Sequence, residues 1–180
     1  ALKGTDPRTQ TPFIWHLFHA RPGGGASAAG DGWHNAGEWH SAGGLKFGSI
    51  EVAEVRFPLH FVKHEFRPDS GGKGQFTGGC GVDLELKLRT TGITVANLAG
   101  DGIRHEARGM CGGHDGAPHQ YSLHAPGAPA QVLASKIEGV QVPAGSRFSI
   151  HSGGGGGYGP NAARTPAARE AEQQAGLSTE

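Results

Sequence analysis

The stretch from Arg67 to Val82 reads RPDSGGKGQFTGGCGV, and it leads directly into VDLELKLR, residues 82–89. Six of its sixteen residues are glycine, which predicts a loop whose backbone turns sharply or closely approaches other segments. In the segment that follows, apolar and charged residues alternate strictly, so the valine and the three leucines share one face of a strand. A glycine-rich loop that leads into a half-buried strand is the starting point for predicting the fold.

Length and charge narrow the class of protein. At 180 residues the chain suffices for one domain with a hydrophobic core, and we predict a single domain, residues 1–180. Lysine plus arginine (16) balance aspartate plus glutamate (16), which predicts no binding to nucleic acid or to an anionic membrane. No apolar run approaches the roughly 20 residues that span a bilayer, and no signal-peptide pattern opens the chain.

The cysteines and the start of the chain bear on its origin. Cys80 and Cys111 have neither metal-ligand spacing nor a disulfide framework, which favours a reduced, cytoplasmic protein and small structural roles for both. The chain opens at Ala1 without methionine, so we expect a processed product or a separately encoded fragment of a larger protein. A hydrophobic content of 36% with many loops predicts a domain that completes its core against a partner.

Glycine (33 residues) and proline (11 residues) are unusually abundant. They gather in clusters between patterned segments, which indicates an ordered but loop-rich domain with many tight turns and close backbone contacts. One long loop, residues 21–48, is rich in glycine, histidine and tryptophan. Loops of this length are functional or disordered, and the tryptophans argue against disorder.

The remaining pattern predicts a mainly β domain, with antiparallel sheets joined by long glycine-rich loops and one C-terminal helix. Residues 93–96 are predicted to form a hairpin with residues 82–89 across a turn at Thr90–Gly92. Besides these two strands, we expect strands at residues 13–18, 50–55, 59–66, 131–134, 140–142 and 147–151.

The C-terminal segment, residues 161–180, carries the only clear set of helix signals. Thr165 suits the N-cap, Pro166 suits the first helical position, and residues 167–175 favour a helix. Gly176 follows, where a helix end is expected. We therefore predict a helix and a short tail at this end of the chain.

Six ordered segments resemble motifs of the hydantoinase B/oxoprolinase family. Residues 67–82 resemble its signature RPDSGGxGxFxGGxGV, and residues 50–59 resemble its segment PxEVLExRxPL. The other similar segments are residues 112–118 (family FGGxxGAPG), 135–136 (LPSK), 142–147 (PGD) and 152–159 (PGGGGYGDP). The resemblance covers nearly the whole chain but only the C-terminal third of a full-length member.

The resemblance implies a function. Family members pair an A-type subunit that binds ATP with a B-type subunit, and they phosphorylate an amide or ketone oxygen. The chain would belong to a complex that opens a cyclic amide such as a hydantoin or lactam. ATP and Mg would be held by the A-type partner, and the N-terminal part of a B-type subunit would be a second partner. ATP-dependent ketone carboxylation, or a non-catalytic structural role, is the alternative. The isolated chain is expected to be inactive.

Polar residues of the 21–48 loop are the candidate catalytic set. Asp31, His34 and His40 offer a general base, an orienting carboxylate or part of the shell of a divalent metal. The alternative is that they hydrogen-bond exposed backbone or contact a neighbouring subunit. The sequence leaves the presence of a metal open.

Arg67, Asp69 and Ser70 carry the family motif and are the candidates for a substrate or interface loop. Arg67 offers a cation for a carboxylate or phosphate, with a structural ion pair as the alternative. Asp69 and Ser70 are typical residues for capping a turn. A structural role is predicted for the motif glycines, namely Gly71, Gly72, Gly78, Gly79, Gly81, Gly155, Gly156, Gly157 and Gly159.

Two other patterns do not predict sites. Gly154, Gly156 and Gly159 satisfy GxGxxG, but they lack the strand before and the helix after that a dinucleotide site requires. His60 and His64 fall in a predicted strand, where they would lie about 13 Å apart. That separation is too large for the pair to share a zinc ion.

Overall fold

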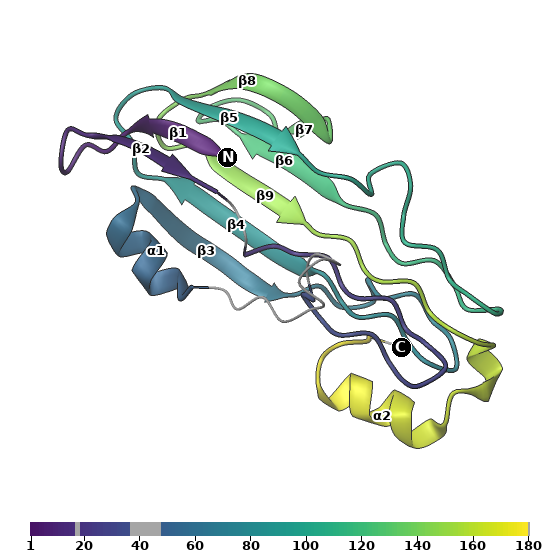
Figure 1. The fold of residues 1–180 in the computed structure, drawn as a ribbon. Coiled ribbons are helices and arrows are strands. Elements are labelled where there is room, and N and C mark those ends of the chain that lie inside the picture. The colour runs from purple at the N-terminus through teal and green to yellow at the C-terminus, as the bar shows by residue number, and fades with distance from the viewer. Residues whose placement is uncertain (17–18, 37–47, 180) are drawn as a thin grey trace.

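The computed structural model describes residues 1–16, 19–36 and 48–179 (Figure 1). These residues form nine strands, two α-helices and a short 3₁₀ helix. The helices are α1 (Ile50–Arg56), η2 (Asn161–Ala163) and α2 (Pro166–Gln174). The strands are β1 (Leu2–Thr5), β2 (Pro12–Trp15), β3 (Leu59–Phe66), β4 (Val82–Leu88), β5 (Thr94–Ala99), β6 (Gln120–His124), β7 (Gln131–Leu133), β8 (Lys136–Val142) and β9 (Arg147–His151).

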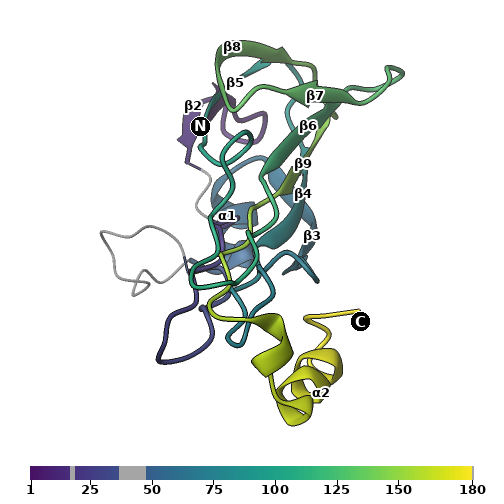
Figure 2. The ribbon, with the colours of Figure 1, turned by 90° about the vertical axis from the view of Figure 1, so that its right-hand side faces the viewer.

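The strands form two antiparallel sheets, of order β2-β1-β5-β8 and β3-β4-β9-β6-β7. The sheets face one another in Figure 2, and one hydrophobic cluster takes residues from both. Trp15 of β2 meets Phe61 of β3 edge to face, with ring centroids 6.1 Å apart. The core therefore lies between the sheets, and the predicted mainly β, antiparallel fold is confirmed.

Strand β4 and helix α2 form where the local pattern predicts them. The valine and the three leucines of β4 are all 2% exposed or less, so the alternating residues cover the core. Thr165 caps α2 by accepting a hydrogen bond from the Ala168 N–H at 3.2 Å, with Pro166 at its first turn. Gly176, which follows α2, has a φ of 69°, the left-handed conformation typical of a helix end.

The strand predicted at residues 50–55 is wrong, because this segment forms helix α1. Its β-branched residues favour a strand, but the Ser49 hydroxyl accepts a hydrogen bond from the Val52 N–H and starts a helix. Ala53 is buried, and Ile50 packs against the core. Their spacing of three residues suits one face of a helix. Capping and packing thus override β propensity here.

The hairpin predicted between residues 82–89 and 93–96 is also wrong. β4 lies in the five-stranded sheet and β5 in the four-stranded sheet, so the two strands do not pair. The Thr90–Gly92 connection carries the chain across the core between the sheets. The buried hydroxyls of Thr90 and Thr94 lie 3.3 Å apart in a hydrogen bond at this crossing.

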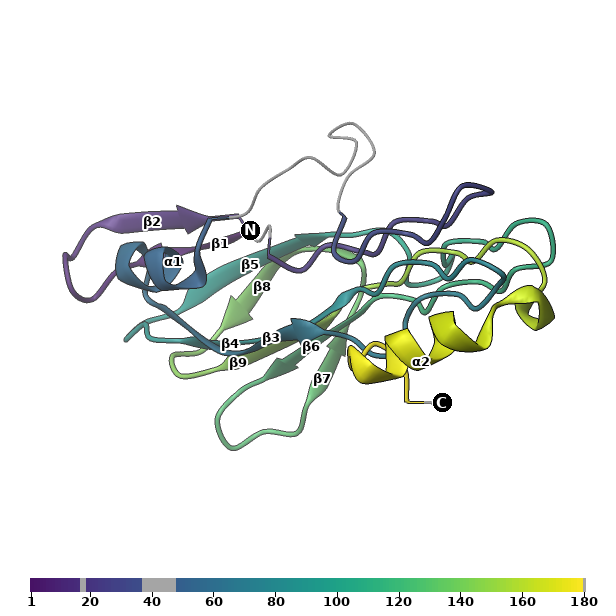
Figure 3. The same ribbon diagram turned by 90° about the horizontal axis from the view of Figure 1, so that it is seen from below.

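Extended glycine-rich segments continue from one end of the sheets (Figure 3). We call them the glycine bundle: residues 22–26, 70–81, 107–117 and 152–159. Residues 153–157 bond to all the others: Gly154 N–H donates to Ala117 O at 3.0 Å, and the N–H groups of Gly23, Gly72 and Met110 donate to Gly153 O, Gly155 O and Gly157 O. A β-strand has at most two neighbours, whereas this segment has more, which requires close backbone approach.

Glycine is required in this bundle for steric reasons. A Cβ built on Gly154 would lie 1.7 Å from Ser70 O, and one on Gly155 would lie 1.9 Å from Gly24 O. Both obstacles are backbone atoms of neighbouring segments, so no side chain can rotate away to make room.

The described helices are α1, α2 and a single 3₁₀ turn. None of them has the length and the apolar character that crossing a membrane requires. This finding agrees with the absence of a long apolar run in the sequence.

Candidate functional site

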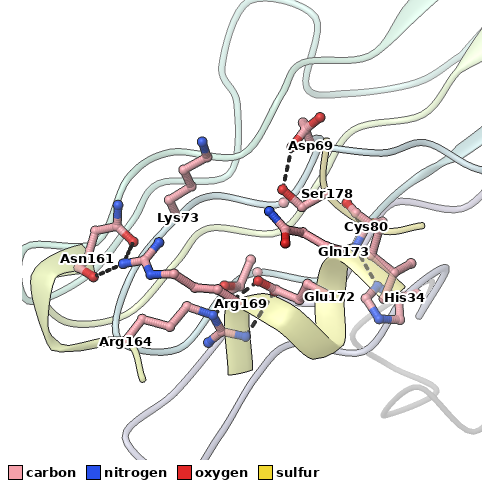
Figure 4. A pocket seen from close by; sticks show the side chains of 14 residues that line it. His34, Asp69, Lys73, Cys80, Asn161, Arg164, Arg169, Glu172, Gln173 and Ser178 are labelled. Atoms are coloured by element: carbon pink, nitrogen blue, oxygen red, sulfur yellow. Dashed lines mark hydrogen bonds and ion pairs between the residues drawn. The ribbon is translucent and has the colours of Figure 1, made fainter. Parts of the chain in front are cut away.

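Helix α2 and the tail behind it pack against the glycine bundle and leave a cavity of about 240 Å³ between them (Figure 4). We call it the α2 cavity. A smaller hollow of about 210 Å³ beside it shares several of its residues and adds Asp31. The ionisable residues of the α2 cavity are His34, Asp69, Lys73, Arg164, Arg169 and Glu172, together with the Cys80 thiol. Two of these, His34 and Asp69, were predicted from the sequence as site residues.

Asp31 is held by Arg164. The guanidinium of Arg164 donates to both carboxylate oxygens of Asp31, at 2.8 and 3.0 Å, and the Thr77 N–H donates to the same carboxylate at 2.7 Å. Burial alone would raise the pKa of Asp31, but these hydrogen bonds outweigh it and hold the pKa below the usual value. Asp31 is therefore a fixed anion that orients a cation.

Arg164 links three parts of the molecule. Its side chain is only 4% exposed, and besides Asp31 it bonds to Glu172 of α2 at 2.9 Å and to Gln75 O at 3.0 Å. The loop of Asp31, the glycine bundle and helix α2 thus meet at one guanidinium. Removing that cation would leave two carboxylates without their partner.

His34 is fixed in one tautomer. Its Nδ1 accepts a hydrogen bond from the Cys80 N–H at 2.8 Å, so a neutral ring carries its proton on Nε2. Burial lowers the pKa of His34, while the negative charges of Glu172 and Asp31 partly oppose that effect. At neutral pH the imidazole is therefore uncharged, and Nε2–H is the donor that it can offer to the α2 cavity.

The structure brings Asp31 and His34 to neighbouring positions without joining them. Asp31 bonds to Arg164 and Thr77, whereas His34 bonds to the backbone of Cys80. No hydrogen bond joins the two side chains, so they do not form a hydrogen-bonded acid–base pair. His40 lies outside the described residues, and its role remains a prediction.

The three polar residues of the family motif bond within the fold. Arg67 Nη1 donates to Pro118 O at 2.9 Å and to Ser152 O at 3.2 Å. Ser70 is buried, where its hydroxyl donates to Arg67 O and accepts from the Gly81 N–H. Both side chains therefore bond to backbone groups of the glycine bundle and of the loops beside it.

Asp69 fastens the C-terminal tail. Its carboxylate accepts hydrogen bonds from the Ser178 hydroxyl and from the hydroxyl and N–H of Thr179. The Thr179 hydroxyl is the main cause of the lowered pKa of Asp69, with burial opposing it and Ser178 adding to it. The backbone of Asp69 has a φ of 55°, and its N–H donates to Leu177 O at 3.0 Å. Asp69 thus closes one wall of the α2 cavity.

The described part of the chain contains no metal cluster, and its buried cysteine, Cys80, is a weak nucleophile. That part holds no group of three or more histidine, cysteine, aspartate or glutamate side chains that could bind a metal ion. His60 bonds to Glu54 and His64 bonds to His19 O, so these two histidines have separate partners. Burial raises the pKa of the Cys80 thiol, which keeps it protonated and weakly nucleophilic.

The sequence did not single out Lys73, Arg164, Arg169 and Glu172 as site residues. Arg169 and Glu172 are three residues apart on the predicted helix, so they lie on the same face of it. This charged face could have indicated that the helix packs against polar groups. The partners of Arg164 could not be predicted from the sequence, because Asp31 is 133 residues away from it.

The neutral state of His34 predicts a pH dependence of stability. Its pKa is lower in the folded chain than the usual value of about 6.5, so its contribution is complete above that pH. As the pH falls below about 6.5 the unfolded chain binds a proton first, and stability decreases.

His34→Asn places an amide oxygen near the Nδ1 position but cannot titrate. Urea unfolding between pH 5 and 7.5 should therefore show a shallower pH dependence for the variant, by at most about 1.4 kcal/mol per pH unit. An unchanged slope would contradict this.

Comparison with known proteins places the chain in a family. The family model for hydantoinase B/oxoprolinase matches residues 1–161. Caprolactamase subunit beta of Pseudomonas jessenii is 32% identical over 98% of this chain and 31% of its own length. The 5-oxoprolinase of Saccharomyces cerevisiae is 30% identical over 76% of this chain and 11% of its own length. The chain thus spans about a third of the first relative and about a tenth of the second.

Two solved structures have the same fold. The crystal structure of ATP-dependent caprolactamase from Pseudomonas jessenii covers 99% of this chain at a TM-score of 0.76 and 23% identity, with 31% of that chain matched. The nucleotide-free structure of acetone carboxylase covers 99% at a TM-score of 0.78 and 21% identity, with 28% of that chain matched. The family match over most of the chain confirms the resemblance that the glycine motifs indicated. This chain belongs to the hydantoinase B/oxoprolinase family.

Proposed function

We propose that this chain is one part of an ATP-dependent assembly that opens a cyclic amide, a hydantoin or a lactam. The observation that carries the proposal is the similarity to caprolactamase subunit beta along 98% of the chain. Residues 1–180 would correspond to the C-terminal part of a hydantoinase B-type subunit. Its partners would be the N-terminal part of that subunit and an A-type subunit that holds ATP and Mg, since the sequence lacks a phosphate-binding P-loop.

The proposed chemistry begins with phosphorylation of the amide. Transfer of the γ-phosphoryl group of ATP to the amide oxygen releases ADP and makes the carbon more electrophilic. Water adds to that carbon, and the C–N bond breaks as the nitrogen takes up a proton. A second water molecule releases phosphate from the resulting acyl phosphate, and an amino acid remains. None of these steps needs a nucleophile from this chain.

The contribution of this chain would be a wall of the site. The α2 cavity is slightly smaller than ordinary small-molecule pockets, so it suits one polar end of a substrate that a partner encloses on its other side. The Nε2–H of His34 would donate to an oxygen of the substrate, and Asp31 would position Arg164. The loop of Arg67, Asp69 and Ser70 would fix the wall against the partner.

The test measures lactam opening by the assembly purified with its native partners. With ATP and caprolactam, the ring-opened amino acid and ADP should appear together. His34→Asn removes the Nε2–H donor and should lower kcat/KM by about a hundredfold, the usual cost of losing one donor to a developing charge. His124→Asn is the control, because His124 bonds to Ser149 and is not a residue of the α2 cavity. Full activity of both His34→Asn and Asp31→Asn would show that this chain has only a structural role in the assembly.

A second candidate function is ATP-dependent ketone carboxylation. It is favoured by the 28% identity to the acetone carboxylase alpha subunit of Xanthobacter autotrophicus over 70% of this chain. Labelled bicarbonate separates the two reactions, because a carboxylase transfers the label to its ketone substrate and an amide hydrolase does not. Turnover of ATP by the purified chain alone would contradict both assignments, since each places the nucleotide on a partner.

A further inference from the structure

A second, larger cavity lies where the glycine bundle meets strand β6. Its volume is about 550 Å³, within the range of ordinary small-molecule sites, and it shares none of its residues with the α2 cavity. We call it the His119 cavity, after the residue that lies beside Tyr121 in its wall. Its other ionisable residues are Arg21, Asp101, His105 and Glu106.

His119 presents one ring nitrogen to this cavity. Its Nδ1 is sealed from solvent and has no hydrogen-bond partner among the described residues, so Nε2 is the nitrogen that remains accessible. A buried N–H without a partner is rarer in proteins than a buried acceptor without one. The proton of the neutral ring therefore belongs on Nε2, which makes His119 a donor toward the cavity. Burial, together with the charge of Arg67, lowers the pKa of His119 and keeps the ring neutral.

Tyr121 offers a second donor beside the first. Its ring stacks on that of His119, with centroids 6.1 Å apart and planes 17° apart. The Tyr121 hydroxyl has no hydrogen bond within the described chain, and the residue lines the same cavity. Two neighbouring polar atoms without protein partners in a cavity are what a ligand site provides before its ligand arrives.

The surrounding glycines make room for these two rings. A Cβ on Gly102 would lie 2.7 Å from Cδ2 of His119, and one on Gly153 would lie 3.2 Å from the same atom. A Cβ on Gly100 would lie 2.2 Å from the Tyr121 hydroxyl. The His119 N–H also donates to Gly102 O at 2.9 Å, which fixes the backbone that carries the ring. The fold thus holds both donors in place.

The polar groups of the His119 cavity differ in exposure. His119 and Tyr121 are half-buried, so their two donors form the inner part of its wall. Glu106 and Asp101 are exposed, so negative charge lies at its mouth. Asp101 pairs with Lys136 at 2.9 Å, but both side chains are more than 70% exposed, and such surface pairs are easily exchanged. A ligand with an inner anion and an outer cation would match this arrangement.

We propose that the His119 cavity binds a small amino acid, with its carboxylate toward His119 and Tyr121 and its ammonium group toward Asp101 and Glu106. Opening a lactam ring produces a molecule of this class, so the choice of an ω-amino acid rests on the proposed function. The existence of the site does not, because it follows from the donors and charges of this chain. The cavity would hold the product, or a compound like it, away from the α2 cavity.

The test is calorimetric titration of the purified chain, without ATP or lactam, using 6-aminohexanoate and glutamate as probes. Hexanoate and hexylamine each carry one of the two charges and should bind at least about tenfold more weakly than 6-aminohexanoate. Tyr121→Phe removes one hydroxyl and should weaken binding about three- to tenfold. His119→Phe keeps an aromatic ring beside Tyr121 without its donor and should weaken binding about tenfold. His124→Phe is the matched control at the far end of β6 and should bind as the parent does.

Three results would overturn this proposal: no binding of either amino acid at roughly 10 mM, equal affinity for hexylamine and 6-aminohexanoate, or unchanged affinity in both ring variants. None of these would affect the proposed function, because the titration needs neither ATP nor a partner. Conversely, amino-acid binding by a chain whose native assembly opens no cyclic amide would support the site and contradict the proposed function.

Discussion

Gly154→Ala is expected to abolish the native fold of this chain. The new methyl carbon would lie 1.7 Å from Ser70 O, far inside contact distance, and 2.3 Å from the carbonyl carbon of the same residue. Both atoms belong to backbone that is itself hydrogen-bonded: the Ala117 N–H donates to Ser70 O at 2.7 Å, and the Gly154 N–H donates to Ala117 O. Relief therefore requires the segments of the glycine bundle to separate. The cost should exceed about 5 kcal/mol, comparable with the whole stability of an ordinary domain.

Gly92→Ala is the matched control for Gly154→Ala. A Cβ at Gly92 would meet no atom within 4 Å, and the residue lies in the connection between β4 and β5. Alanine there should be neutral or stabilise by up to about 1 kcal/mol, because it restricts the unfolded chain. Circular dichroism and urea unfolding of the two variants measure the difference. A Gly154→Ala protein that unfolds within about 1 kcal/mol of the parent would contradict the close packing of the bundle.

Arg164→Met should detach helix α2 from the glycine bundle. The substitution keeps much of the side-chain volume but removes the cation that Asp31, Glu172 and Gln75 O share. Because Arg164 is 4% exposed, its loss leaves carboxylates without a partner in a partly buried site. Asp31 is half exposed, which moderates the penalty, so we expect a loss of about 3 kcal/mol. Amide hydrogen exchange should become faster throughout α2.

Two further variants test this interpretation of Arg164. Lys136→Met removes a cation from the exposed pair with Asp101 and should change stability by at most about 0.5 kcal/mol. Combining Asp31→Asn with Arg164→Met should cost less than the sum of the two single changes, because the uncompensated charge is gone. Strict additivity, together with slow exchange in α2, would show that the ion pairs do not hold the helix.

The sequence predicts those elements whose cause is local. The alternation in β4 and the capping residues around α2 act within a few positions, and both elements form where expected. Helix α1 was missed because Ile50, Val52 and Val55 favour a strand, while the Ser49 cap is a single hydrogen bond. The hairpin of β4 and β5 was wrong because sheet membership depends on contacts between distant residues.

The candidate site shows the same difference between features with a local cause and contacts between distant residues. The sequence named His34 and Asp69 as candidates in two separate segments, and both line the α2 cavity. Their hydrogen-bond partners were not predictable, because Cys80 and Thr179 lie 46 and 110 residues away from them in sequence. No sequence motif marks the His119 cavity, because it forms only where His119 and Tyr121 pack against the glycine bundle.

Native mass spectrometry of the assembly purified from its native source tests the central claim most directly. The proposal predicts that this 18.6 kDa chain is found with larger partners, one of A type that binds ATP and one that supplies the rest of a B-type subunit. Intact masses of the separated chains would establish that composition. A lone 18.6 kDa monomer would contradict the proposed part in an ATP-dependent ring-opening enzyme, leaving shared ancestry as the only meaning of the family match.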